Sequence, residues 1–382
     1  MSWSPLFTDT LCDSIWKKIH EIASIFLHTD SSNPFLMHGD IGDILFLFYY
    51  CSETGNEEYY EKTTRLFFDC IDKQKPLLKT DKDIESLSSF ENGLSGFGWS
   101  LTHFQAQEIT SGDVFDTMGT VDPQILRSMI YHVQNDRYGF LQGASGIALY
   151  CLNKPDRFAK EYLNRFVWEL YKRICSNKLD GSDDFSIPTG LAGLWCVLQK
   201  LENRYFRIEY LSDIIDYLTD IFIQRKTVEL TAKKGIIPGW NRSEVGLLWT
   251  RFQISQTKSQ ALEQWEDYGK LYLDNDDCFE AGLYGGNFSL GHLFNRIYQQ
   301  TGELQFKQFA ERFFLKGLQH VNYTEPQTGY NVWNTGINNV YGFHRGVLGG
   351  LAGIGLALLS TVSDESPDWD ESLLSLIHIS EP

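Results

Sequence analysis

A short glycine-rich phrase recurs seven times along this chain, and an apolar run follows each copy. A period of this length indicates a supersecondary unit that is repeated along the chain. The fold is therefore constrained by the structure of one unit and by the packing of seven such units. The equivalent positions, 43 to 64 residues apart, are Gly39, Gly93, Gly143, Gly190, Ser243, Gly286 and Gly350.

Each unit has the pattern of two helices. In the segments between phrases, such as 303–318, apolar residues recur at spacings of three and four, which is typical of a helix with one buried face. After the phrases, runs such as 147–152 and 194–198 are apolar almost all round, which indicates a helix buried on several sides. We therefore predict an amphipathic outer helix, a glycine loop and a buried inner helix in each unit.

Seven such hairpins give about fourteen helices, so the predicted fold class is all-α. An open solenoid needs polar capping repeats at its ends, but the last unit, 346–359, is as apolar as the middle ones. We therefore predict a closed α/α toroid with two concentric layers and with the glycine loops at one rim. No linker interrupts the repeat, so 1–374 is predicted to be one domain. Residues 375–382 leave the pattern, and we expect them to be a non-native tail.

Composition excludes several classes of partner. A net charge of −17 argues against nucleic acid and anionic membranes, both of which need clustered cations. No apolar run is long enough for a membrane span, and the first residues do not resemble a signal peptide. The seven scattered cysteines are odd in number, and several lie in apolar runs, as reduced buried cysteines do. We expect a cytoplasmic protein.

The phrases around the glycines resemble those of the lanthionine synthetase C-like family, the cyclases of lanthipeptide biosynthesis. The resemblance covers nearly the whole chain and is strongest at 138–147, 282–298 and 350–356. It implies an α/α toroid of seven hairpins, in agreement with the repeat count. It also implies a zinc ion at the rim that holds a substrate cysteine as thiolate.

The zinc ligands that the resemblance implies are missing from this chain. The family binds zinc through two cysteines and one histidine, a soft donor set that leaves a fourth position open. One cysteine follows Gly-Trp in the fifth unit, where Asn241 stands here. The second cysteine and the histidine are replaced by Tyr284 and Gly285. We therefore predict no zinc and no other cofactor.

The acid/base positions that the resemblance implies are also changed. The aspartate of the third unit aligns with Gly139, and the histidine of the fourth unit aligns with Thr189. Neither residue can titrate near neutral pH as a general acid or base must. We therefore predict no catalytic residue, and whether the chain is an enzyme stays open at this point.

The altered positions and their polar and aromatic neighbours define the candidate site, which we expect to converge at the rim in a ligand-sized space. A substitute metal site from Cys278, His38 and His344 is disfavoured, because they come from different units without ligand spacing. Further polar or aromatic rim candidates are Asp40, Asp43, Trp99 and Trp195, although core packing is the favoured role for Trp195. The candidate site consists of Gly139, Thr189, Trp240, Asn241, Arg242, Glu244, Tyr284 and Gly285.

Three functions are compatible with these residues. The leading hypothesis is a zinc-less, cyclase-like protein of lanthipeptide-type modification that binds a peptide or a partner enzyme. The second is an active zinc-independent cyclase that adds cysteine thiols to dehydroamino acids by positioning an enclosed peptide. The third is a carbohydrate-active α/α barrel, in which a pair such as Asp40 and Glu244 would serve as acid and base.

Overall fold

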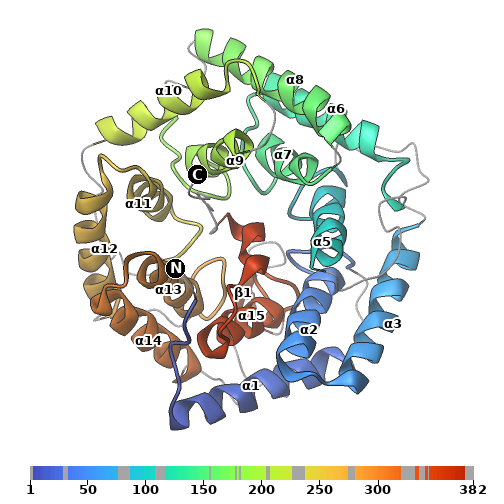
Figure 1. Ribbon diagram of the computed structural model, residues 1–382, viewed down its shortest axis with the longest axis vertical. Helices are drawn as coiled ribbons and strands as arrows, with labels where there is room; N and C mark the ends of the chain where they lie inside the picture. The colour runs from blue at the N-terminus through green and yellow to red at the C-terminus, as the bar shows by residue number, and fades with distance from the viewer. Residues whose placement is uncertain are drawn as a thin grey trace. The chain divides into compact units, whose positions relative to one another are not determined.

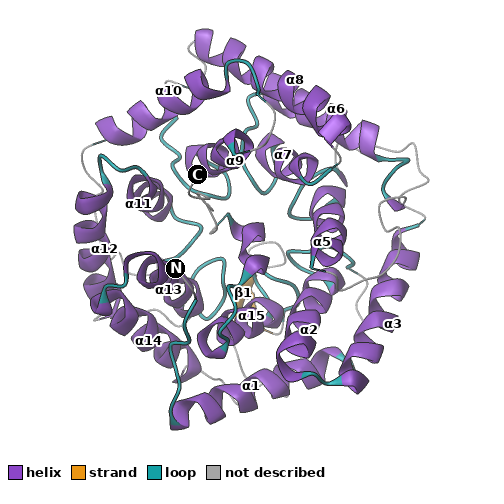
Figure 2. Ribbon diagram, viewed as in Figure 1, coloured by secondary structure: helices purple, strands orange, loops and turns teal. Residues whose placement is uncertain are grey.

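The structure is a computed structural model, and helices make up nearly all of its regular structure (Figure 1; Figure 2). The expected non-native tail, 375–382, lies outside the described residues. Among the described helices, none combines the length and the apolarity that crossing a lipid bilayer requires. The residues described are 3–28, 33–75, 87–107, 117–154, 156–176, 179, 182–203, 207–225, 237–273, 280–319, 332–334, 340–342 and 344–374.

Seven helices begin within the repeated phrases, six at the residue after the equivalent glycine and one at Ser243, so each starts slightly earlier than predicted. They are buried almost all round: every residue of the third, Ala144–Leu152, is buried. These helices are α2 (Asp40–Thr54), α5 (Leu94–Ala106), α7 (Ala144–Leu152), α9 (Leu191–Glu202), α11 (Ser243–Gln253), α13 (Asn287–Thr301) and α15 (Leu351–Val362).

Seven other described helices alternate with these. In the first of them, Ile15, Ile19 and Phe26 are buried on one face, and the Asp9 carboxylate caps the N-terminus by accepting a hydrogen bond from the Leu11 N–H. The described α-helices therefore number fourteen, as the repeat count predicts. This second set consists of α1 (Thr10–Phe26), α3 (Glu57–Gln74), α6 (Asp122–Gln134), α8 (Asp156–Cys175), α10 (Leu211–Gln224), α12 (Lys258–Leu273) and α14 (Leu304–Gln319).

The described chain divides into two compact units. In unit 2, α5, α7, α9 and α11 pack side by side in sequence order, and α6, α8 and α10 pack against them. In unit 1, α13, α15 and α2 pack side by side, with α14, α1 and α3 against them. Each of the two units thus consists of two helical layers. That residues 1–374 form a single domain stays a prediction. Unit 1 comprises Met1–Lys75, Thr231–Trp240 and Glu266–Asp370, and unit 2 comprises Pro76–Leu230, Asn241–Trp265 and Glu371–Pro382.

In four of the phrases the later glycine (Gly42, Gly146, Gly193 or Gly353) lies in the first turn of its helix, against the loop that precedes the helix. A Cβ atom at Gly146 would collide with the carbonyl oxygen of Phe140, and one at Gly193 would collide with that of Ile187. Because glycine has no Cβ atom, the loop can fold back over the start of the helix. This contact explains why the phrase recurs.

A short antiparallel hairpin was not predicted from the sequence. Strands β1 (Val332–Asn334) and β2 (Val340–Gly342) pair with Trp333 opposite Tyr341. They lie between α14 and α15, in the longest interval of the repeat. Three residues are too few to show the alternation by which a strand is identified.

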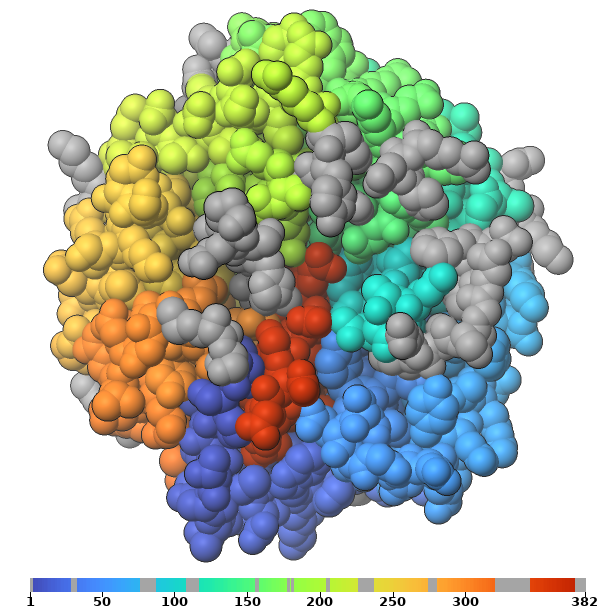
Figure 3. Space-filling model, in the orientation of Figure 1, coloured from blue at the N-terminus to red at the C-terminus, as the bar shows by residue number. Residues whose placement is uncertain are grey.

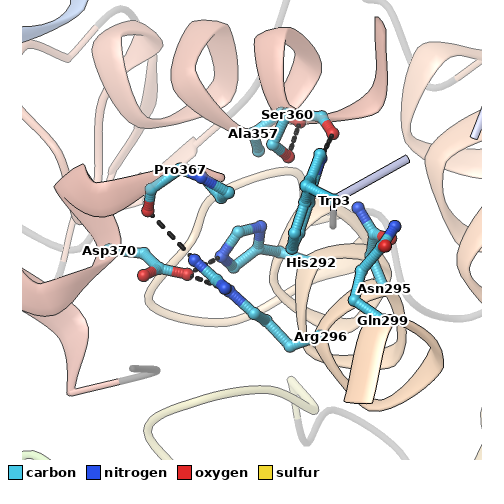
Figure 4. A network of polar contacts seen from close by, with 9 residues as sticks. All are labelled: Trp3, His292, Asn295, Arg296, Gln299, Ala357, Ser360, Pro367 and Asp370. Atoms are coloured by element: carbon cyan, nitrogen blue, oxygen red, sulfur yellow. Dashed lines mark hydrogen bonds and ion pairs between the residues drawn. The ribbon is translucent and has the colours of Figure 1, made fainter. Parts of the chain in front are cut away.

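A buried polar network fixes both ends of unit 1 to α13 (Figure 4). Arg296 Nε donates to Asp370 Oδ2 at 2.6 Å, and its guanidinium lies 4.7 Å from the Trp3 ring centroid. His292 Nε2 lies 2.8 Å from the same carboxylate oxygen. Burial lowers the pKa of His292, so the neutral ring donates its N–H to the carboxylate.

Hydrogen bonds from Trp3 and Leu6 attach the N-terminal segment to the end of α15. Trp3 Nε1 donates to the Ser360 carbonyl at 3.0 Å, and the Leu6 N–H donates to the Thr361 carbonyl at 2.8 Å. In the space-filling view, the dark blue N-terminal residues lie beside the red residues near the end of the chain (Figure 3). Sequence segments that are more than 350 residues apart therefore share one core.

We expect Asp370→Asn to lower the free energy of unfolding by about 3–5 kcal/mol at pH 7, because it leaves the buried Arg296 cation without its counter-charge. Burial by itself raises the pKa of Asp370, but Arg296 and His292 outweigh burial and hold it below 3.8. The stabilisation is therefore present above pH 3.8 and is lost as the pH falls through the lower folded-state value. Denaturant titrations over pH would measure it, with exposed Asp364→Asn as the control. Equal losses in the two variants would contradict this account.

Candidate functional site

The predicted site residues of unit 1 lie where two backbone segments touch. Gly239 has φ +147°, and a Cβ atom there would lie 2.7 Å from the Gly285 Cα. The Trp240 N–H donates to Ser289 Oγ at 2.9 Å, in the first turn of α13. The Trp240 and Tyr284 rings meet edge to face, with centroids 6.2 Å apart. The structure therefore brings Trp240, Tyr284 and Gly285 together.

The predicted site residues of unit 2 include a second close backbone contact. A Cβ atom at Gly139 would lie 2.9 Å from both the Cα and the carbonyl oxygen of Thr189. Nearby, the Leu141 N–H donates to the Pro188 carbonyl at 2.9 Å. The loops before α7 and α9 are thus in direct contact, and no side chain fits at Gly139 unless the backbone of Thr189 moves.

The Asp184 carboxylate, which the sequence analysis missed, organises this part of the site. It accepts hydrogen bonds from the Thr189 hydroxyl at 2.6 Å, the Ser186 N–H at 2.9 Å and the Ser243 hydroxyl at 3.1 Å. Burial alone raises the pKa of Asp184, but these hydrogen bonds outweigh it and hold the pKa below 3.8. The signal was the Asp-x-Ser pattern ahead of Gly190, which is typical of a side chain that bonds to its own loop.

The start of α11 carries the other predicted residues of unit 2. Arg242 Nε and Glu244 Oε1 form an ion pair at 3.1 Å. The Asn241 Oδ1 atom is buried and accepts no hydrogen bond within the described part of the chain. Asn241 belongs to unit 2, whereas Trp240, Tyr284 and Gly285 belong to unit 1. The convergence of all eight site residues therefore stays a prediction.

A cavity of about 660 Å³ lies between the loops of unit 2 and contains both predicted acid/base positions. Burial, followed by the hydrogen bond that the Tyr138 hydroxyl donates to Asp136 at 2.7 Å, raises the pKa of Tyr138 well above its usual value. The cavity offers hydrogen-bonding groups on Tyr138 and Gln142 and the guanidinium of Arg137. Its lining residues are Asp136, Arg137, Tyr138, Gly139, Gln142, Gly143, Leu179, Ser182, Pro188, Thr189, Gly190 and Leu191.

Two aromatic rim candidates lie in the core of unit 2. Trp99 is buried, donates to Glu371 Oε2 at 3.0 Å and stacks on His103. Trp195 is also buried and donates to Thr219 Oγ1 at 3.0 Å. The rim placement was therefore wrong for Trp99, whereas Trp195 has the core-packing role that we favoured for it, and neither ring offers a surface for a sugar.

Comparison with known proteins places this arrangement in a family. A family model described as "Lanthionine synthetase C-like protein" matches residues 30–374. The chain belongs to the lanthionine synthetase C-like family. A solved structure of "Nisin cyclase" is similar, with a TM-score of 0.69 and 14% sequence identity over 95% of this chain and 98% of that one. This likeness confirms the fold expected from the sequence. No curated protein gave a match.

The donor atoms at the positions where the lanthionine synthetase C-like resemblance implies zinc do not suit that ion. An amide, a neutral phenol and a glycine stand in place of two thiolates and an imidazole, and neutral oxygens are weak ligands for zinc. Among the described residues, no three His, Cys, Asp or Glu side chains form a group that could hold a metal ion. Cys278, considered for a substitute site, lies outside the described residues.

We expect Gly139→Ala to lower the free energy of unfolding by about 1–3 kcal/mol, because its Cβ atom would press on the Thr189 backbone. Chemical denaturation would measure the loss. Ser182→Ala, in the lining of the same cavity, is the control and should change stability by less than about 0.5 kcal/mol. Equal stability of the two variants would show that the loops can separate freely.

We expect Thr189→Val to raise the pKa of Asp184, because the Thr189 hydroxyl is the strongest of the hydrogen-bond donors that lower it. NMR titration of the Asp184 carboxyl carbon would measure the change. Thr219→Val, which removes a hydroxyl elsewhere in unit 2, should leave that pKa unchanged. An unchanged Asp184 pKa in Thr189→Val would show that the Thr189 hydroxyl does not lower that pKa.

Proposed function

We propose that this lanthionine synthetase C-like protein binds a peptide of lanthipeptide-type modification without bound zinc and does not catalyse ring formation. It would act by holding the peptide, alone or beside a modifying enzyme. The proposal rests on the contrast between a cavity that is present and reactive groups that have been replaced.

The observation that carries the proposal is the contact between Gly139 and Thr189. The resemblance places the family's acidic residue at Gly139, yet a Cβ atom there would lie only 2.9 Å from two backbone atoms of Thr189. The loop geometry has thus closed around glycine, and reverting this one residue would not restore a carboxylate without moving the backbone. This geometry supports the proposal that no acid acts from this position.

The neighbouring position supports the same conclusion. The Thr189 hydroxyl is committed to Asp184 and lies 2.9 Å from Ser186 Oγ. The Asp184 pKa is held below 3.8, so this carboxylate is a weak base at neutral pH. The cluster stabilises loops and is poorly suited to transferring a proton.

The cavity itself supports peptide binding. Its volume of about 660 Å³ lies within the range of ligand sites in proteins. Leu179, Pro188 and Leu191 provide apolar surface, while Arg137 and Gln142 provide hydrogen-bond donors. A mixed lining of this kind suits a peptide, which carries apolar side chains on a polar backbone.

The second candidate is an active zinc-independent cyclase. The same cavity favours it, because an enclosed peptide would hold a cysteine thiol next to a dehydroamino acid and so lower the entropic barrier to addition. The sulfur would bond to the β-carbon, and the thiol proton would pass to the α-carbon. The two candidates differ only in whether rings form.

A peptide that contains dehydroalanine and cysteine should bind to the wild-type protein. No new thioether rings should form in the peptide. Fluorescence anisotropy would measure binding, and thiol alkylation with mass spectrometry would measure ring formation. Ser182→Trp, which fills the cavity, should weaken binding at least about tenfold, equivalent to 1.4 kcal/mol. Ser176→Trp, at an exposed position after α8, should bind as the wild type does.

Two results would contradict this proposal. Ring formation above the rate without protein would establish the active cyclase instead. Equal binding by Ser182→Trp and wild type would show that the peptide does not occupy this cavity.

A further inference from the structure

A second cavity, of about 430 Å³, lies within unit 1 and shares no residue with the cavity around Gly139. It is bounded by the end of α1, the first turns of α2, the end of α3 and the segment before α15. Its lining residues are Phe26, Asp40, Asp43, Ile44, Leu47, Leu66, Asp69, Asp72, Lys73 and Arg345.

The lining combines an apolar wall with an excess of carboxylates. Phe26, Ile44, Leu47 and Leu66 form the apolar part. The charged part contains four aspartates but only one lysine and one arginine. Neutral or anionic ligands would leave this excess uncompensated, whereas a cation with an apolar stem would complement both parts.

The two cationic side chains that line the cavity, Arg345 and Lys73, already lie close to the inner carboxylates. Arg345 Nε donates to Asp43 Oδ2 at 2.5 Å, and the Arg345 guanidinium lies 3.4 Å from Asp40. The Gly346 N–H donates to the other Asp43 oxygen at 2.9 Å. Lys73 Nζ lies 3.8 Å from Asp40. These contacts fix Asp43 and Asp40 on α2 and leave the outer aspartates to set the charge of the mouth.

The outer carboxylates come from the last turns of α3. Asp72 pairs with Lys75 at 2.5 Å, but both side chains are exposed, so that pair is weak. Asp69 is exposed and forms no hydrogen bond or ion pair with any residue in the described part of the chain. An incoming cation therefore meets at the mouth a carboxylate that forms no ion pair with the described lysines and arginines.

We propose that this cavity binds the side chain of a basic residue, an ammonium or guanidinium on an alkyl stem, presented by a peptide. The alkyl stem would lie on Leu47 and Leu66, and the charged end would meet Asp69. The site is independent of the proposed function, since its ligand carries neither a thiol nor a dehydroamino acid.

The buried Asp43 makes the site sensitive to pH. Burial raises the pKa of Asp43 to about 7, although Arg345 and the Gly346 N–H oppose this shift. Asp40 on the same helix, Arg345 beside it and Asp69, Asp72 and Lys73 on α3 are the other charged groups of the cavity. Since Asp43 loses its proton near neutrality, affinity for a cation should increase from pH 6 to pH 8.

Matched probes test the proposal directly. Nα-acetyl-lysine amide and Nα-acetyl-norleucine amide have the same alkyl stem, but only the first carries an ammonium group. NMR titration of the full chain should show the lysine probe shifting Leu47 and Leu66 resonances and binding more tightly at pH 8 than at pH 6. The norleucine probe should bind at least about fivefold more weakly.

Protein variants locate the binding. Asp69→Asn, an exposed change that should not disturb folding, should weaken binding of the lysine probe about threefold. Asp220→Asn, at an exposed position on α10, is matched in charge and should leave the affinity unchanged. Equal affinities for the two probes, equal affinities of Asp69→Asn and wild type, or equal weakening by Asp69→Asn and Asp220→Asn would each overturn the proposal.

Discussion

The contact between a glycine loop and the first turn of the helix that follows it, seen at Gly42, Gly146, Gly193 and Gly353, is the constraint on which the rest of the structure depends. At Gly146 and Gly353 a Cβ atom would collide with a carbonyl oxygen of the preceding loop. Only a residue without a side chain permits this approach, so the repeat keeps glycine where the loop crosses the helix. In these repeats the contact fixes the loop against the first turn of the buried helix.

Close backbone packing of the same kind also determines which side chains the candidate site can hold. Gly139 lies against Thr189, and Gly239 lies against Gly285, with backbone meeting backbone in both places. The first contact leaves no room for the aspartate that the lanthionine synthetase C-like resemblance places at Gly139, and a cavity lies beside it.

The helix starts could be predicted because their cause is local. A phrase such as 143–146 and the apolar run after it are adjacent in sequence, and their pattern repeats. The interactions that were missed join distant segments. Asp370 reaches Arg296 across 74 residues, and Asp184 reaches Ser243 across 59. No periodicity marks such pairs. Trp99 was misplaced for a related reason, since it is buried and donates a hydrogen bond to Glu371, 272 residues away.

The central claim is that this family member works without zinc. The most direct test is elemental analysis of the full-length wild-type protein, produced with ample zinc and purified without chelators. The amide, phenol and glycine at Asn241, Tyr284 and Gly285 should retain far less than about one zinc ion per chain. About one zinc ion per chain, retained through dialysis against zinc-free buffer, would contradict the account.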